Sequence, residues 1–186
     1  MPTNHIWKTI STETIADCKV FSVNRNICES PAGRHQSHNF YVLHPHNWVN
    51  VIPITHDQQV VLVEQFRHGT GNITLEIPGG MIDPEDASSA DAAARELLEE
   101  TGYVAEKLVH LGRNHPNPAI QSNYCETFLA PLVHQIEQPR FESTEYIELK
   151  LVPLREIPNL IQSGSITSAL VIVAFHYLHL YKPDYL

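Results

Sequence analysis

The sequence has few cysteines and no long apolar run, and each shortage narrows what the protein can be. Its three cysteines stand far apart, at positions 18, 28 and 125. That spacing suits neither a disulfide framework nor a metal site, so we expect reduced thiols. The longest apolar run, Ala169–Phe175, is too short to cross a bilayer, so we expect no membrane partner. The first twenty residues hold no signal-peptide core, which predicts a cytoplasmic protein.

Positive charge is also scarce. The 12 Lys and Arg residues are outnumbered by 21 Asp and Glu residues, which gives a formal net charge of −9. Such a surface repels the phosphates of DNA and RNA, so we expect no nucleic-acid partner. A small phosphorylated ligand can still bind, but it needs a metal ion or a local arginine. The length of 186 residues suffices for one domain with a real core and a small additional part.

Short β-type patterns dominate the chain on both sides of one strong helical pattern. The predicted strands cover residues 19–24, 39–43, 49–55, 60–66, 73–77, 108–111, 126–130 and 146–152. Within them, Pro53 fits best at a sheet edge or a bulge. Two helices, at about 155–162 and 168–181, should end the chain, and the second is apolar nearly all round, which predicts burial.

This order of elements favours an α+β fold with a mixed sheet over an alternating βαβ fold. The segment "HPHNW", residues 44–48, reads as a connector. We therefore expect a small N-terminal β-domain over residues 1–47 and a main domain over residues 48–186.

The strongest helical pattern carries three glutamates on one side. Ser88 with Asp91 three residues later is a start signal, and Gly102 is a stop signal. Glu96, Glu99 and Glu100 are neighbours at helical spacing, so their like charges repel one another. An acidic helix face is either simply solvated or binds a hard divalent cation such as Mg²⁺. The helix alone leaves both interpretations open.

The stretch "LEIPGGMIDPEDASSADAAARELLEETGY", residues 75–103, resembles the Nudix box, a strand–loop–helix motif that binds a metal-diphosphate. Gly80 opens the motif, and it is completed by Arg95, Glu96, Glu99, Glu100 and Gly102. The loop is one residue longer than the family pattern, and Glu85 or Asp86 takes the place of its loop glutamate. The resemblance implies an α/β/α sandwich, in which a mixed sheet lies between helices.

The resemblance also implies the chemistry. Glu96, Glu99 and Glu100, together with the carbonyl group of Gly79, would bind Mg²⁺, with Mn²⁺ as a substitute. Arg95 would hold the loop and the acids in place while water splits a P–O–P bridge. The general base would come from the segment "FESTEYIELKLVPLREI" or from the helix. We prefer Glu145 to Glu142 for this role, and Glu99 is a third candidate.

The flanking sequence resembles the branch of the family that cleaves ADP-ribose and sugar nucleotides. The segment "VLVEQFRHG", residues 61–69, followed by "LEIPGG", carries this resemblance. It implies that Arg67 contacts the substrate phosphates and that Glu76 orients Arg67 or contacts the substrate. Pro118, sixteen residues after Gly102, is the position that marks ADP-ribose hydrolases. In this branch the N-terminal strands exchange between two subunits, which implies a homodimer. Phe21, Tyr41 and Trp48 are candidates for stacking on the nucleobase, and core packing is the preferred interpretation of each.

Three functions fit these features to different degrees. The first is Mg²⁺-dependent hydrolysis of a nucleoside diphosphate sugar of the ADP-ribose, ADP-glucose or GDP-mannose type. The second is hydrolysis of damaged or non-canonical nucleoside triphosphates, which the N-terminal extension and Pro118 oppose. The third is a non-catalytic sugar-nucleotide sensor, which the complete set of box glutamates opposes. The sequence therefore favours the first function.

Overall fold

The computed structural model describes residues 5–31, 36–140 and 146–185, and the chain divides into two compact units. One unit comprises Met1–His46 together with His115–Asn123. The other comprises Asn47–Asn114 and Tyr124–Leu186. The segment from the middle of the chain joins the first unit through backbone hydrogen bonds: Leu43 N donates to Ile120 O (2.7 Å), and Ser122 N donates to Leu43 O (3.1 Å).

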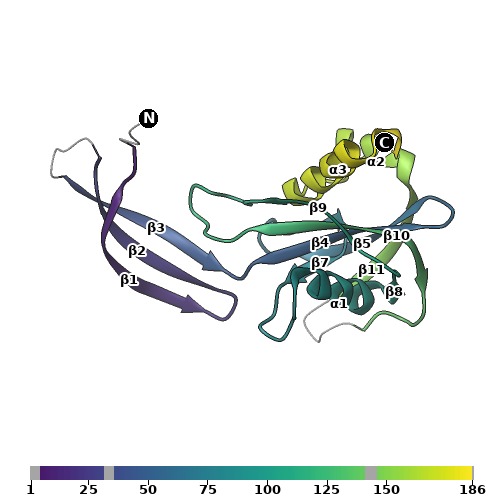
Figure 1. The fold of residues 1–186 in the computed structure, drawn as a ribbon, viewed down its shortest axis with the longest axis horizontal. Helices are drawn as coiled ribbons and strands as arrows, with labels where there is room; N and C mark the ends of the chain where they lie inside the picture. Colours follow the sequence, from purple (N-terminus) through teal and green to yellow (C-terminus); the bar gives the residue numbers. More distant parts are fainter. Residues whose placement is uncertain (1–4, 32–35, 141–145, 186) are drawn as a thin grey trace. The chain divides into compact units, whose positions relative to one another are not determined.

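The first unit contains a three-stranded antiparallel sheet in the order β1-β2-β3 (Figure 1). Its strands are β1 (Lys8–Cys18), β2 (Phe21–Glu29) and β3 (Ser37–Pro45). The first of these strands was not predicted from the sequence. All eleven of its residues are exposed, so it carries no alternation of buried and exposed positions that would reveal a strand.

The second unit is built on an eight-stranded mixed sheet. Its main path runs β11-β5-β4-β10-β8, and β6, β7 and β9 pair with β5, β4 and β10, respectively. Among the described strands β4 and β10 pair in parallel and the other pairs are antiparallel. The strands are β4 (Trp48–Thr55), β5 (Gln59–Arg67), β6 (Asn72–Glu76), β7 (Gly79–Met81), β8 (Tyr103–Val104), β9 (Val109–Asn114), β10 (Cys125–Gln135) and β11 (Ile147–Pro153).

Pro53 lies in β4, which is a central strand of this sheet. The prediction that Pro53 lies at a sheet edge or a bulge is therefore wrong. The pairing of β7 with β4 ends at Asn50, and the pairing of β5 with β4 is at Ile54. On that side the ladder is open at Pro53, so the missing N–H group of proline leaves no bond unmade.

Helices cover both faces of this sheet (Figure 1). Helix α1 (Ser89–Thr101) packs through Leu97 against one face, in a cluster that includes Val51 and Val61. Helices α2 (Ile157–Gln162) and α3 (Ala169–Tyr181) pack against the other, in a second cluster. Alternate residues of a strand point to opposite faces, so each central strand serves both clusters. The expected α/β/α sandwich is confirmed.

Helix α1 begins and ends where the sequence signals place it. The side chain of Ser88 accepts a hydrogen bond from Asp91 N, and Gly102 adopts a left-handed φ of 72°. The N–H of Gly102 then donates to Leu98 O, which closes the last turn. These two caps fix where the helix begins and ends. None of the helices among the described residues is both long and apolar enough to cross a membrane.

Helix α3 is buried on one face, whereas its sequence suggested burial all round. Its buried residues are Val171, Ala174, Phe175 and Leu178, which recur at the spacing of one helical face. Leu180 and Tyr181 are exposed, because only one face of the helix packs against the sheet. Short 3₁₀ turns at Leu154–Glu156 and Pro183–Tyr185 flank the two C-terminal helices.

Candidate active site

Gly79 and Gly80 were expected to form a turn; they begin the short strand β7, directly after a bend at Pro78. This bend and the two glycines, called the glycine turn below, contact two of the box glutamates. The N–H group of Gly79 donates a hydrogen bond of 2.9 Å to Oε2 of Glu100, whose side chain is buried. A Cβ atom at Gly80 would lie only 2.4 Å from Oε1 of Glu96. The carboxylate of Glu96 therefore occupies space that any larger residue at position 80 would fill. Glycine at position 80 is therefore what allows Glu96 to approach the backbone so closely.

Arg95 connects the helix to the loop before it. Its guanidinium donates two hydrogen bonds to Asp86, of 3.1 Å and 2.9 Å, and one of 3.0 Å to the carbonyl oxygen of Met81. The same side chain donates to Glu96 (2.9 Å) and to Glu99 (3.1 Å). Five hydrogen bonds from one side chain thus tie the loop and two of the acids together.

Asp86 is the loop acid that pairs with Arg95, so the structure decides between it and Glu85. Glu85 is exposed. Asp86 accepts the bidentate pair from Arg95 and also a hydrogen bond of 2.9 Å from Asp83 N. These hydrogen bonds, with that from Arg95 the largest cause, hold the pKa of Asp86 below its usual value. The extra loop residue therefore does not prevent the Arg–acid pairing.

The donor set at the turn fits a hard divalent cation. Glu96, Glu99 and Glu100 supply carboxylate oxygens, which Mg²⁺ and Mn²⁺ prefer. The glycine turn leaves no Cβ atom to fill the space in front of Glu96. Among the described residues no three His, Cys, Asp or Glu side chains are gathered as a finished metal site, and two of the glutamates share Arg95. The chemistry of the residues fits the cation, and the ligand set remains a prediction.

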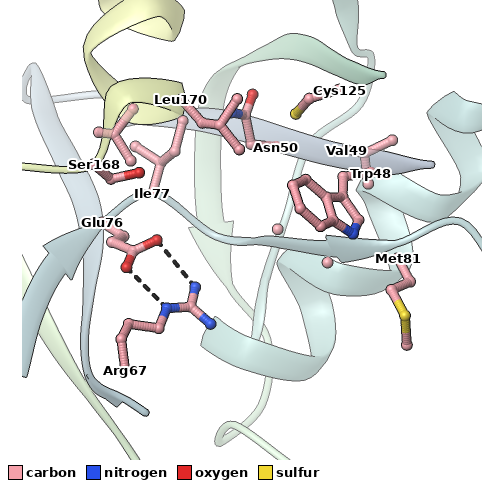
Figure 2. A pocket seen from close by; sticks show the side chains of 13 residues that line it. Trp48, Val49, Asn50, Arg67, Glu76, Ile77, Met81, Cys125, Ser168 and Leu170 are labelled. Carbon is pink, nitrogen blue, oxygen red and sulfur yellow. Dashed lines mark hydrogen bonds and ion pairs between the residues drawn. The ribbon is translucent and has the colours of Figure 1, made fainter. Parts of the chain in front are cut away.

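A pocket of about 410 Å³ opens beside the turn (Figure 2). On one wall Arg67 and Glu76 form a bidentate ion pair, with Nε–Oε1 and Nη2–Oε2 distances of 2.9 Å and 3.0 Å. Thr74 donates a further hydrogen bond of 2.6 Å to Glu76. Burial would raise the pKa of Glu76, but the hydrogen bonds and the charge of Arg67 outweigh burial and lower it. Glu76 is thus an ionised carboxylate that holds the Arg67 guanidinium at the pocket.

Several pocket residues were not predicted as site residues from the sequence. The lining residues are Trp48, Val49, Asn50, Arg67, Glu76, Ile77, Gly79, Gly80, Met81, Cys125, Ser168, Leu170 and Val171. They come from strands and a helix that are far apart along the chain, so no spacing pattern joins them. Of the lining residues that were not predicted, Ile77 and Met81 lie within the motif, beside the glycine pair. The pKa of the Cys125 thiol is raised to about 12, mainly by burial. The thiol is therefore a poor nucleophile.

Three predicted site residues do not belong to the described part of the second unit. Pro118 belongs to the segment His115–Asn123, which is part of the first unit. Glu142 and Glu145 lie outside the described residues. The second unit therefore brings together Arg67 with Glu76, and Gly79 with Arg95, Glu96, Glu99 and Glu100, whereas the roles of the other three residues remain predictions.

Comparison with known proteins agrees with this arrangement. The NUDIX domain model matches residues 44–170. The chain is 31% identical over 174 residues to the ADP-ribose pyrophosphatase of Bacillus subtilis (strain 168), covering 93% of this chain and 92% of the relative. It is 30% identical to the methanol dehydrogenase activator of Bacillus methanolicus, over 93% and 92% of the two chains.

A solved structure, described as an ADP compounds hydrolase, shares the fold with a TM-score of 0.84 and 23% identity. The superposition covers 96% of this chain and 95% of the other. The domain match spans most of the chain, and it includes the turn, the loop and the helix that Arg95 ties together. The protein is therefore a member of the Nudix family.

Proposed function

We propose that the protein hydrolyses the diphosphate bridge of a nucleoside diphosphate sugar, of the ADP-ribose, ADP-glucose or GDP-mannose type. The observation that carries the proposal is that the Gly79-Gly80 turn, which holds Glu96 and Glu100, also lines the pocket that contains Arg67. Water attacks one phosphorus, the bond from that phosphorus to the bridging oxygen breaks, and the oxygen leaves with the other phosphate. The products are a nucleoside monophosphate and a sugar phosphate. The similarity to an ADP-ribose pyrophosphatase supports this choice of substrate.

In this proposal, Glu96, Glu99 and Glu100, with the carbonyl of Gly79, hold Mg²⁺, and Mn²⁺ can replace it. A bound cation offsets the phosphate charge and makes phosphorus more electrophilic. A chain with a net charge of −9 needs that help to bind a diphosphate. Arg95 keeps the acids and the loop beside the turn through its five hydrogen bonds. Arg67, held by Glu76, contacts the substrate phosphates.

The general base is proposed to be Glu145, with Glu142 and then Glu99 as the alternatives. A glutamate on a loop can reach the attacking water when substrate binds. Glu99 is partly exposed and pairs with Arg95 at 3.1 Å, which fits a positioning role better than proton transfer. Comparing kcat against pH for Glu145→Gln and Glu142→Gln tests the order, because only loss of the base removes the acidic limb of the profile.

We also propose a cytoplasmic homodimer formed through the N-terminal β-domain, residues 1–47. The described part of this domain exposes large apolar side chains, among them Ile10, Ile15, Phe40 and Tyr41. Exposed apolar patches of this kind mark interaction surfaces. The same proposal includes a contact between this domain and the nucleobase of the substrate. It also includes a contact between Pro118 and the substrate. The cytoplasmic location is supported by cysteines that are all free.

The test is release of phosphomonoester from a panel of sugar nucleotides and nucleoside triphosphates, each with Mg²⁺ and with EDTA. Cleavage of ADP-ribose or a hexose nucleotide that requires the metal is the expected result. Cleavage of triphosphates alone would replace the proposal with the damaged-nucleotide function. Binding of a sugar nucleotide without any product in the presence of Mg²⁺ would favour the sensor.

A further inference from the structure

Asn50 places a polar side chain between two apolar residues of strand β4. Its neighbours Val49 and Val51 are buried apolar residues, and Asn50 itself is only 6% exposed. Its Oδ1 atom is buried and has no hydrogen-bond partner among the residues that the structure describes. A buried amide oxygen without a partner destabilises a folded protein, so it needs an explanation.

Asn50 lines the pocket together with Gly79 and Gly80 of the glycine turn (Figure 2). Asn50 is the strand partner of Gly79. A Cβ atom at Gly79 would lie 3.0 Å from Cβ of Asn50, so the two residues are in direct contact. Asn50 therefore belongs to the wall of the pocket that the glycine turn also lines.

The chemistry of the amide restricts the group that it can recognise. Amide oxygens accept hydrogen bonds, and an ionised phosphate has no hydrogen to donate. The unpaired atom of Asn50 is the oxygen Oδ1, and a hydroxyl group can donate a hydrogen bond to it. In a nucleoside diphosphate sugar, the ring joined directly to the bridge is a sugar on both arms, and the base is one ring further away. A diphosphate at the turn therefore brings sugar hydroxyls, before the base, to Asn50.

We propose that the Asn50 amide is a specificity-determining group that hydrogen-bonds a hydroxyl of the sugar attached to the diphosphate bridge. This inference rests on the proposed function and names the part of the substrate that the pocket reads. Trp48, Ile77 and Leu170 form apolar walls of the same pocket. In such a pocket a single polar group, here the amide, fixes the orientation of the ligand. A substrate without the hydroxyl leaves the amide unpaired, which costs about 10- to 100-fold in kcat/KM.

The first experiment compares kcat/KM of the wild-type protein and Asn50→Leu, which keeps the volume and removes the amide. The substrates are ADP-ribose, analogues that lack one hydroxyl of either sugar, and an analogue with hypoxanthine in place of adenine. We expect the wild type to lose activity on one deoxy analogue. Asn50→Leu should show that same reduced activity on ADP-ribose and no further loss on the analogue. The analogue that closes this cycle identifies the arm that Asn50 contacts.

The second experiment measures Tm without substrate. Asn50→Leu should raise Tm by about 2–4 °C, because it removes an unpaired buried amide. Thr127→Val is the matched control. Thr127 is the partner of Asn50 on β10, is fully buried, and also has an unpartnered oxygen in the described structure. It is not among the described lining residues of the pocket, so its variant should raise Tm and leave the substrate ratios unchanged.

Three results would overturn the assignment while the wild type remains active on ADP-ribose. A lower Tm for Asn50→Leu would mean that the amide is paired in the free protein, through a bound water for example. An equal loss on ADP-ribose and on every deoxy analogue would make its role structural. A loss that tracks the change of base would remove the sugar from the assignment. Inactivity of the wild type on all sugar nucleotides would instead remove the proposed function, and the inference with it.

Discussion

The side chains beside the glycine turn stabilise the fold, and the same side chains are the proposed metal ligands. Glu100 and Glu99 are neighbours in sequence, but Glu100 is buried and bonded to Gly79 N, whereas Glu99 is partly exposed and bonded to Arg95. A buried carboxylate is costly unless hydrogen bonds or a cation compensate it. At Glu100 a change to glutamine removes the negative charge but keeps an oxygen that can accept the hydrogen bond from Gly79 N. The effect of the charge can therefore be separated from an effect on the fold.

Glu100→Gln should lower kcat by about 100-fold or more, since even outer-shell partners of a metal are worth roughly 10–100-fold. The amide oxygen of glutamine can still accept the hydrogen bond from Gly79 N, so far-UV circular dichroism should be unchanged. The control is Glu106→Gln, which removes the same single negative charge at an exposed position after the helix. Near-normal turnover in Glu100→Gln would remove this residue from the metal ligands.

Asp86→Asn should lower the free energy of unfolding by about 1–3 kcal/mol near neutral pH, because it breaks a charged pair with Arg95. Arg95 holds the pKa of Asp86 below its unfolded value, so the pair stabilises the folded protein above about pH 4. That contribution is lost as the pH falls through the lowered pKa. Urea unfolding at a series of pH values should therefore show a difference from wild type that shrinks in acid.

The exposed neighbour Glu85 gives the control for this pH series. Glu85→Gln should match the wild type at every pH. A difference between Asp86→Asn and wild type that stays constant down to strong acid would mean that the stabilisation does not come from the ionised carboxylate.

At the scale of elements, the strand–turn–helix unit depends on two adjacent glycines that do different things. A Cβ at Gly79 would meet backbone, lying 2.3 Å from Val49 O, whereas a Cβ at Gly80 would meet the flexible end of Glu96. Backbone cannot move without disturbing the sheet, but a carboxylate can rotate away. The same change of residue should therefore affect stability at one position and activity at the next.

Gly79→Ala should lower Tm by several degrees, by a clash of the kind that costs about 1–3 kcal/mol in a packed interior. Gly80→Ala should keep Tm near that of wild type and reduce kcat, because it displaces Glu96. Thermal unfolding and steady-state kinetics of both variants decide this. Gly69→Ala is the control, since nothing lies within 4 Å of a Cβ there and its φ is not in the left-handed region. Equal losses of stability at positions 79 and 80 would contradict the distinction.

At the scale of the whole molecule, the exposed apolar side chains of the N-terminal sheet predict an assembly. Phe40, 42% exposed, packs edge-on against Trp7 with ring centroids 5.1 Å apart. Phe40→Glu should place a charge in the subunit contact and shift the mass in light scattering from two chains towards one. Ser37→Glu adds the same charge at an exposed polar position of the same strand and should remain a dimer. A wild-type protein with the mass of one chain would exclude the homodimer.

The fold could be predicted where the signal is local. The caps of α1 at Ser88 and Gly102 were found because capping depends on residues within one turn of the helix end. Strand β1 was missed because none of its side chains is buried. Pro53 was placed at an edge because the opening of the ladder beside it depends on where β5 and β7 pair, which the strand itself does not encode.

For the site, the sequence alone predicted the glycine pair, the three glutamates and Arg95, because they belong to one contiguous motif that resembles the Nudix box. The three-dimensional fold was needed to show that Asp86, and not Glu85, pairs with Arg95, because the two acids are adjacent and either fits the motif equally well. In the structure Glu85 is exposed. The fold also brought Asn50 of β4 and Ser168 before α3 into the pocket beside Arg67. Such neighbours are joined by packing of distant segments, and packing leaves no periodic signal in a single sequence.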